Sequence, residues 1–239
     1  MTNSKQRDTR ISKSLSKLLR HQAVAEGLQI SNSGQILLSD VLSHNFLKSN
    51  HATFEDIVRI VTNNEKQRFK LEKKDDEQWY ISASQGHSIQ QVNHLTHGMI
   101  ELDKMDDSQW PEMIVHGTYN HTLEEIKNSG GLSKMGRNQI HFTYTIPRKF
   151  YNVLNMNTPV DITTDDSNYS NSQDPVVSGV RGNCQVLIFL NIAKLRKSDL
   201  KFYKSDNKVI LSPGDENGFI PLYFIDKVVD CQSGIMPFP

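Results

Sequence analysis

The spacing of the apolar residues changes along this chain, and this change restricts the folds open to it. At the start they recur at helical spacing, as in residues 11–19. Farther along they gather in short runs, of which Val186–Leu190 is the longest. The sequence therefore predicts an α+β protein with two parts, residues 1–97 and 98–239.

Three helices are expected in the first part. The first covers residues 11–21 and ends before Gly27, whose lack of a side chain suits a helix end. Ser39 can cap a second helix, which bears apolar residues up to position 47. Thr53 and Asp56 have the spacing of a capping box and open a third helix.

A β-hairpin follows these helices. Its strands are Arg68–Glu72 and Gln78–Ser82, and the charged residues 73–77 join them. Three helices followed by a hairpin is the order of a winged-helix module. Modules of this kind bind nucleic acid or protein, so the pattern alone leaves both partners open.

The second part is expected to be rich in strands. Residues 98–112 resemble a linker or an edge segment, and residues 161–174 are polar and predict an exposed loop. The expected elements are the helix Leu123–Asn128 and the strands Met113–Thr118, Gln139–Tyr144, Val186–Leu190, Val209–Leu211, Phe219–Pro221 and Asp226–Val229.

The charges are balanced overall but unevenly distributed. The chain has 27 basic and 27 acidic residues, which argues at first against a nucleic-acid partner. Residues 1–97 nevertheless hold 13 of the basic and 10 of the acidic residues, whereas acids gather in residues 103–107 and 161–174. The neutral total therefore combines a basic first part with a more acidic second part.

The sequence also disfavours several classes of protein. It has no apolar run of the roughly 18–20 residues that span a membrane, and its polar start lacks a signal core. Two cysteines, Cys184 and Cys231, match no metal motif. We therefore expect an intracellular protein of the cytoplasm or nucleus, with no metal and no membrane contact.

Polar residues interrupt the structural patterns at five places. Each motif alone is compatible with an ordinary turn or helix end, for example an Arg-His pair facing a helix dipole. The five motifs are Arg20-His21 at the end of the first helix, Gln67-Arg68-Phe69, Gln85-Gly86-His87-Ser88, His116-Gly117-Thr118 with Arg137 and His141 downstream, and Ser178–Gly182 with Arg181.

Arginine is the shared element of these motifs. Its planar guanidinium group binds phosphate oxygens in pairs and stays charged at every working pH. No catalytic triad, acidic metal cluster or Walker-type loop competes with the arginines. From the residues alone, the sequence predicts a phosphate-handling site shared between the two parts.

Taken together, the motifs resemble the RNA 2'-phosphotransferase family, which removes the splice-junction 2'-phosphate from tRNA. The forms KQRF and ISASQGHS are most similar to its fungal members. The matching stretches follow the order of the family and cover nearly the whole chain: residues 12–21, 64–69, 84–89, 115–118, 131–142 and 178–182.

This resemblance implies the fold and the catalytic residues. It implies a winged-helix-like lobe over residues 1–97 that binds the RNA phosphate, and an NAD⁺-binding lobe of ADP-ribosyltransferase fold over residues 98–239. The Arg-His-Arg-Arg catalytic set of the family falls on Arg20, His21, Arg68 and Arg137.

The resemblance also implies the substrate contacts. The expected contacts to NAD⁺ are His116, Gly117, Thr118, His141, Ser88 and Arg181, and those to the substrate phosphate are Gln85, Gly86 and His87. The chain departs from the family at Gln139, where many members have histidine. We interpret Gln139 as a residue that points away from the ligand or as a tolerated polar substitution.

The implied reaction has two steps and consumes NAD⁺. The RNA 2'-phosphate displaces nicotinamide to form RNA-2'-phospho-ADP-ribose, and the ribose 2''-hydroxyl then attacks phosphorus. The products are 2'-hydroxyl RNA and ADP-ribose 1'',2''-cyclic phosphate, which completes tRNA splicing. The implied partners are tRNA or another RNA with an internal 2'-phosphate, and the protein is expected to act as a monomer.

Two other functions remain open from the sequence. An ADP-ribosyltransferase that modifies proteins or terminal nucleic-acid phosphates would use the second part, but it would not need Arg20, His21 and Arg68. A winged-helix nucleic-acid binder without enzymatic activity would leave the His-Gly-Thr motif and Arg137 unexplained.

Overall fold

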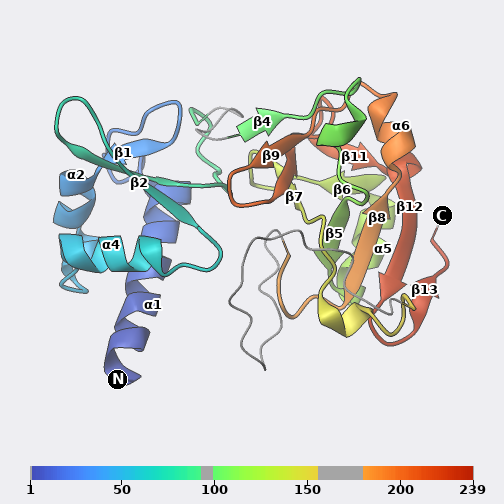
Figure 1. Ribbon diagram of the computed structural model, residues 1–239, viewed down its shortest axis with the longest axis horizontal. Helices are drawn as coiled ribbons and strands as arrows, with labels where there is room; N and C mark the ends of the chain where they lie inside the picture. The colour runs from blue at the N-terminus through green and yellow to red at the C-terminus, as the bar shows by residue number, and fades with distance from the viewer. Residues whose placement is uncertain (1, 93–98, 156–179, 239) are drawn as a thin grey trace. The chain divides into compact units, whose positions relative to one another are not determined.

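The computed structural model describes residues 2–92, 99–155 and 180–238 of the chain (Figure 1). These residues form a mixed structure of helices and sheets, which confirms the α+β class. The expected loop 161–174, residues 178 and 179, and the boundary at 97/98 lie outside the described residues. Within the described ranges, no helix has the length and apolar character that a membrane span needs.

The chain divides into two compact units that differ from a simple cut along the sequence. Unit 1 comprises Met1–Ile100 together with Met135–Gln139 and Ser205–Asn207. Unit 2 comprises Glu101–Lys134, Ile140–Lys204 and Lys208–Pro239. Two short segments of the second half of the sequence therefore belong to the unit formed by the first half.

Unit 1 packs helices against a three-stranded antiparallel sheet of order β1-β3-β2 (Figure 1). Its strands are β1 (Gln35–Leu37), β2 (Phe69–Lys73) and β3 (Trp79–Ala83). Its helices are α1 (Thr2–Lys17), the π-helical turn η1 (Leu18–Gln22), α2 (Leu38–Ser43), α3 (Asn45–Lys48) and α4 (Phe54–Thr62). The expected hairpin is confirmed as β2 and β3, whereas β1 was not expected.

The second expected helix is in fact two short helices. Leu37, not Ser39, precedes the first turn of α2, and the chain becomes extended at His44 before α3 begins. The His44 side chain accepts a hydrogen bond from the Phe46 N–H at 3.3 Å, so it caps α3. This local cap explains why the helix predicted across residues 39–47 is interrupted.

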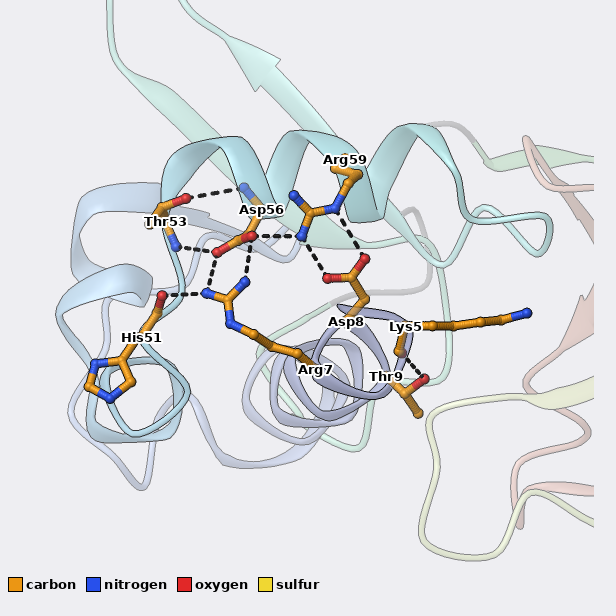
Figure 2. A network of polar contacts seen from close by, with 8 residues as sticks. All are labelled: Lys5, Arg7, Asp8, Thr9, His51, Thr53, Asp56 and Arg59. Carbon is orange, nitrogen blue, oxygen red and sulfur yellow. Dashed lines mark hydrogen bonds and ion pairs between the residues drawn. The ribbon is translucent and has the colours of Figure 1, made fainter. Parts of the chain in front are cut away.

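Asp56 at the start of α4 joins the first and last helices of unit 1 (Figure 2). Its carboxylate accepts hydrogen bonds from Arg7 at 2.6 and 2.7 Å and from Arg59 at 2.6 Å. It also accepts the Thr53 N–H at 3.0 Å, while the Thr53 hydroxyl accepts the Asp56 N–H. The predicted capping box is confirmed, and its carboxylate also holds α1 against α4.

The Arg7 hydrogen bonds hold the pKa of Asp56 well below its usual range. Replacing Asp56 by Asn removes the charge that Arg7 and Arg59 share, although both arginines retain some solvent contact. We expect Asp56→Asn to lower the free energy of unfolding by about 2–3 kcal/mol in a urea titration. The control Asp8→Asn loses only the outer pair with Arg59 and should cost under about 1 kcal/mol. Equal losses in the two variants would contradict the central role of Asp56.

Unit 2 is built around a four-stranded sheet of order β13-β12-β8-β5 (Figure 1). All five residues of β8 are buried, which confirms the expected core strand. The four strands are β5 (Val115–Thr118), β8 (Val186–Leu190), β12 (Ile225–Asp230) and β13 (Gly234–Met236). Strand β5 lies at the edge of this sheet, and on its outer side Val115 pairs with Thr143.

Two smaller sheets and short helices complete the described fold. One sheet has the order β4-β9-β10-β7 and the other pairs β11 with β6. Their strands are β4 (Met99–Glu101), β6 (Gly131–Ser133), β7 (Ile140–Phe142), β9 (Tyr203–Ser205), β10 (Ile210–Ser212) and β11 (Phe219–Pro221). The helices are α5 (Leu123–Asn128), which was expected, and α6 (Ile192–Arg196). The 3₁₀ turns are Asp107–Gln109, Asn120–Thr122, Arg148–Phe150 and Leu222–Phe224.

Candidate functional site

The first part of the candidate site is the turn that ends the first helix of unit 1. Here α1 widens into η1, which buries Leu18 and Leu19 and presents Arg20 and His21. Such π-helical turns occur often at functional sites. Ser88 donates its N–H to the Arg20 carbonyl at 2.9 Å, and its hydroxyl lies 2.9 Å from His21 Nδ1. Ser88, expected as an NAD⁺ contact, therefore holds both catalytic candidates in place.

Gly86 lies against the side chain of Arg20. Its backbone has a φ of +86°, which strongly favours glycine. A side chain at this position would begin 3.6 Å from Arg20 Cδ and Nη1. Glycine thus lets the turn before Ser88 pass close to the Arg20 side chain.

Arg68 stands at the start of β2 and is held by a local network. Its Nη1 donates to Asn64 Oδ1 at 3.1 Å, and the same oxygen accepts the Lys66 N–H at 3.1 Å. The Arg68 carbonyl accepts the Ser84 N–H at 2.9 Å. Gln67, just before Arg68, has a left-handed backbone with a φ of 42°. Strained non-glycine residues of this kind cluster at functional sites, and here one positions an arginine.

Arg137 reaches unit 1 through the segment Met135–Gln139. Its neighbour Asn138 donates its N–H to the His87 carbonyl at 2.9 Å. The Asn138 side chain donates to the carbonyls of Ile89 at 3.1 Å and Val92 at 2.9 Å. Asn138 was not singled out from the sequence, because only the tertiary structure shows that it anchors Arg137.

The charges of these residues act on one another. Burial, together with the charges of Arg68 and Arg137, lowers the pKa of Arg20 to about 10. Burial also lowers the pKa of His21, with added effects from Arg20 and Arg137. No carboxylate contributes to either shift. The structure thus brings together all four residues of the predicted catalytic set, in an arrangement that an anion would stabilise.

His87 and Gln85 lie beneath this cluster. His87 is only 4% exposed, and its Nε2 has no hydrogen-bond partner among the described residues. Burial, together with the charges of Arg20 and His21, lowers the His87 pKa to about 4. Gln85 accepts a hydrogen bond from Ser205, which belongs to the same unit. At neutral pH His87 is therefore an uncharged, buried side chain close to Arg20 and His21.

Because the pKa of His87 is low in the folded protein, the free energy of unfolding should depend on pH. As the pH falls from 6.5 to about 4, the unfolded chain takes up a proton that folded His87 resists, so the folded state loses stability. The loss should reach up to about 3 kcal/mol for this group. His87→Gln should flatten the pH dependence of unfolding in this interval, whereas His121→Gln, at an exposed site, should not. Parallel curves for wild type and His87→Gln would contradict this account.

The second part of the candidate site is the edge strand β5 in unit 2, which carries His116, Gly117 and Thr118. His116 donates its Nδ1–H to the carbonyl of His141 on β7 at 2.9 Å. A carbonyl can only accept, so Nδ1 carries a hydrogen, and in the neutral imidazole Nε2 carries the lone pair. This tautomer suits a hydroxyl donor such as that of a ribose.

The polar backbone groups of Gly117 face the side of β5 opposite to β8. The Thr118 carbonyl accepts from Gln185 on the β8 side, whereas Val115 bonds to Thr143 on the opposite side. Because hydrogen-bonding directions alternate along an antiparallel strand, the Gly117 N–H and C=O point away from β8. This position suits a ligand with an amide group.

The absence of a side chain at Gly117 has a packing cause. A Cβ there would lie 1.8 Å from Val180 Cγ2 and 3.4 Å from Cys184 Sγ. Glycine is therefore required because Val180 fills the space above it. Gly117 was expected only as an NAD⁺ contact, and its packing against Val180 joins segments that are distant in the sequence.

Thr118 and Arg181, both expected near NAD⁺, have partners within unit 2. Thr118 is buried, and its hydroxyl lies 2.6 Å from that of Thr122. Arg181 is exposed and stacks over Tyr119, with the guanidinium carbon 5.9 Å from the ring centre. Their contacts with a nucleotide stay predictions.

Gln139, where many relatives were expected to have histidine, is buried beside Met99. Its amide nitrogen lies 3.9 Å from the Met99 sulfur, and the residue belongs to unit 1. His141, two residues later, belongs to unit 2. No group of three or more potential metal ligands occurs among the described residues.

The packing of Gly117 can be tested by paired substitutions. Gly117→Ala should destabilise the protein by about 1–3 kcal/mol because its methyl group overlaps Val180. Adding Val180→Ala should restore much of that loss, although Val180→Ala alone should destabilise by leaving a cavity. The measurement is the free energy of unfolding of all four proteins in urea. Strictly additive effects would contradict the overlap.

The cation cluster of unit 1 is of the kind that binds an anion. The sequence pattern of the RNA 2'-phosphotransferase (Tpt1/KptA) family matches residues 6–214. The tRNA 2'-phosphotransferase 1 of Danio rerio is 34% identical, covering 93% of this chain and 86% of the relative.

Two further relatives agree with this match. The tRNA 2'-phosphotransferase of Saccharomyces cerevisiae is 34% identical over 93% of this chain and 84% of the relative. The human tRNA 2'-phosphotransferase 1 is 32% identical over 91% of this chain and 74% of the relative. The chain belongs to the RNA 2'-phosphotransferase family, which confirms the resemblance found in the sequence.

Proposed function

We propose that this enzyme transfers the splice-junction 2'-phosphate of tRNA to NAD⁺. The products are 2'-hydroxyl RNA, nicotinamide and ADP-ribose 1'',2''-cyclic phosphate. The observation that carries this proposal is the convergence of the charges of Arg20, Arg68 and Arg137 beside His21, where burial and neighbouring arginines lower the pKa values of Arg20 and His21. The names of the zebrafish, yeast and human relatives support the same reaction.

Each unit has a proposed task. Unit 1, with its helices and β-hairpin, is a winged-helix-like lobe that binds the RNA phosphate. Unit 2 is an ADP-ribosyltransferase-like lobe that binds NAD⁺ as a substrate. The enzyme works as a monomer inside the cell, where its tRNA substrate is found.

The described residues of β5 fit NAD⁺ in two respects. The Gly117 N–H and C=O can pair with the carboxamide of nicotinamide, and His116 Nε2 can accept a ribose hydroxyl. The cluster of Arg20, Arg68 and Arg137 fits the phosphate of the RNA. A reaction between two bound substrates draws a large part of its rate from such positioning.

The first step needs positioning more than proton transfer. A phosphate monoester is already ionised at neutral pH, so its oxygen attacks the anomeric carbon as the bond to nicotinamide breaks. His21, with its lowered pKa, is uncharged and can donate or accept one hydrogen bond while Ser88 fixes its ring. The arginines hold the phosphate in place and offset the repulsion between two anionic substrates.

The second step places more demand on the arginines. The ribose 2''-hydroxyl attacks phosphorus, the bond to the RNA 2'-oxygen breaks, and that oxygen receives a proton. Negative charge builds on the phosphoryl oxygens during this exchange, where fixed donors are worth roughly 3–4 kcal/mol each. Arg68 and Arg137 are the donors that we assign to this step.

The reaction is tested by incubating the protein with a short RNA that carries one internal 2'-phosphate, with and without NAD⁺. We expect nicotinamide, 2'-hydroxyl RNA and the cyclic phosphate only when both substrates are present. An ADP-ribose adduct that never resolves would favour the alternative ADP-ribosyltransferase. No reaction by folded protein would refute the proposal.

Arg137→Ala should slow the second step more than the first, because the phosphoryl charge grows in the second. We therefore expect the ADP-ribosylated RNA to accumulate in single-turnover reactions analysed by gel and mass spectrometry. Arg137→Lys keeps the charge but loses the paired donors, so it should give an intermediate level. An equal slowing of both steps would contradict the role assigned to Arg137.

A further inference from the structure

Helix α1 carries a stripe of exposed cations on the side opposite to its buried face. Arg10, Lys13 and Lys17 are exposed and follow the spacing i, i+3, i+7, which places them on one face of the helix. The opposite face buries Ile11 and Leu15 in the core of unit 1. We call Arg10, Lys13 and Lys17 the α1 stripe.

The α1 stripe lacks the ion pairs that neutralise the other cations of this region. Arg7 and Arg59 both bind Asp56, and Figure 2 shows them turned toward one another between α1 and α4. Within the described ranges, no carboxylate lies within ion-pair distance of the three stripe residues. Lys17 instead lies 4.7 Å over the Phe46 ring. The acidic residues of unit 1 therefore do not neutralise this face of α1, which stays positively charged.

The stripe leads along the helix toward the phosphate cluster. Four residues after Lys17 comes His21, and α1 runs without a break into the turn that bears Arg20 and His21. At 1.5 Å per residue, Arg10 and His21 are about 16 Å apart along the axis. An RNA strand held by its 2'-phosphate at Arg20 would therefore have further phosphates within reach of the stripe.

We propose that the α1 stripe binds the phosphate backbone of the RNA that flanks the 2'-phosphate. This proposal rests on the proposed function, which supplies the RNA partner. The three side chains are long cations, which suit phosphate contacts that position a strand and do not read its sequence. The stripe would thus favour long RNA over short fragments.

The test compares two RNAs that carry the same 2'-phosphate, a trinucleotide and a stem-loop of tRNA anticodon type. Their affinities are measured by fluorescence anisotropy at several salt concentrations with the full chain. The variant Arg10→Gln, Lys13→Gln, Lys17→Gln should bind the stem-loop about tenfold more weakly at low salt. Its slope of log affinity against log salt should fall by about 2, and its trinucleotide affinity should stay unchanged.

The matched control replaces three cations that already have partners, Lys73, Lys74 and Lys127, by Gln. It makes the same change in net charge and should leave stem-loop binding near wild type. The proposal is overturned if stem-loop affinity and salt slope stay at wild-type values in the stripe variant, or if both variants lose affinity equally. Loss of trinucleotide binding in the stripe variant would also overturn it.

The binding test of the α1 stripe can fail or succeed independently of the test of the proposed reaction. The anisotropy measurement needs no chemical step, whereas the reaction is scored with wild-type protein, the trinucleotide and NAD⁺. A wild-type protein that binds RNA through the stripe but releases no nicotinamide would refute the reaction and leave the stripe standing.

Discussion

The repulsion among Arg20, Arg68 and Arg137 is the constraint on which the rest of the site depends. Burial of Arg20 and the charges of Arg68 and Arg137 lower its pKa. The folded chain therefore holds cations whose charges oppose one another, and a bound anion would relieve this repulsion. A 2'-phosphate can relieve it, because its oxygens accept the paired donors of guanidinium groups.

Neutral groups help to position Arg20, His21 and Arg68. The Arg20 carbonyl accepts the Ser88 N–H, the Ser88 hydroxyl lies beside His21 Nδ1, and Asn64 accepts a hydrogen bond from Arg68. The Asp56 carboxylate acts elsewhere, where it joins α1 to α4. This separation explains how a chain with no net charge can offer a positive site to RNA.

Local features of the fold were predictable from the sequence, and long-range ones were not. The Thr53–Asp56 capping box, the hairpin and β8 follow from spacing within a few residues. The break at His44 and the strand β1 depend on a side-chain cap and on a partner strand far along the chain. The four catalytic candidates came from motifs, but Asn138 and Val180 were missed because their contacts join distant segments.

The central claim is that the arginine cluster recognises the 2'-phosphate itself. The most direct measurement compares the affinities of two RNA oligonucleotides that differ only in having a 2'-phosphate or a 2'-hydroxyl at one position. The account predicts that the phosphorylated RNA binds at least tenfold more tightly and that Arg20→Gln abolishes this difference. Equal affinities of wild-type protein for the two RNAs would contradict the account.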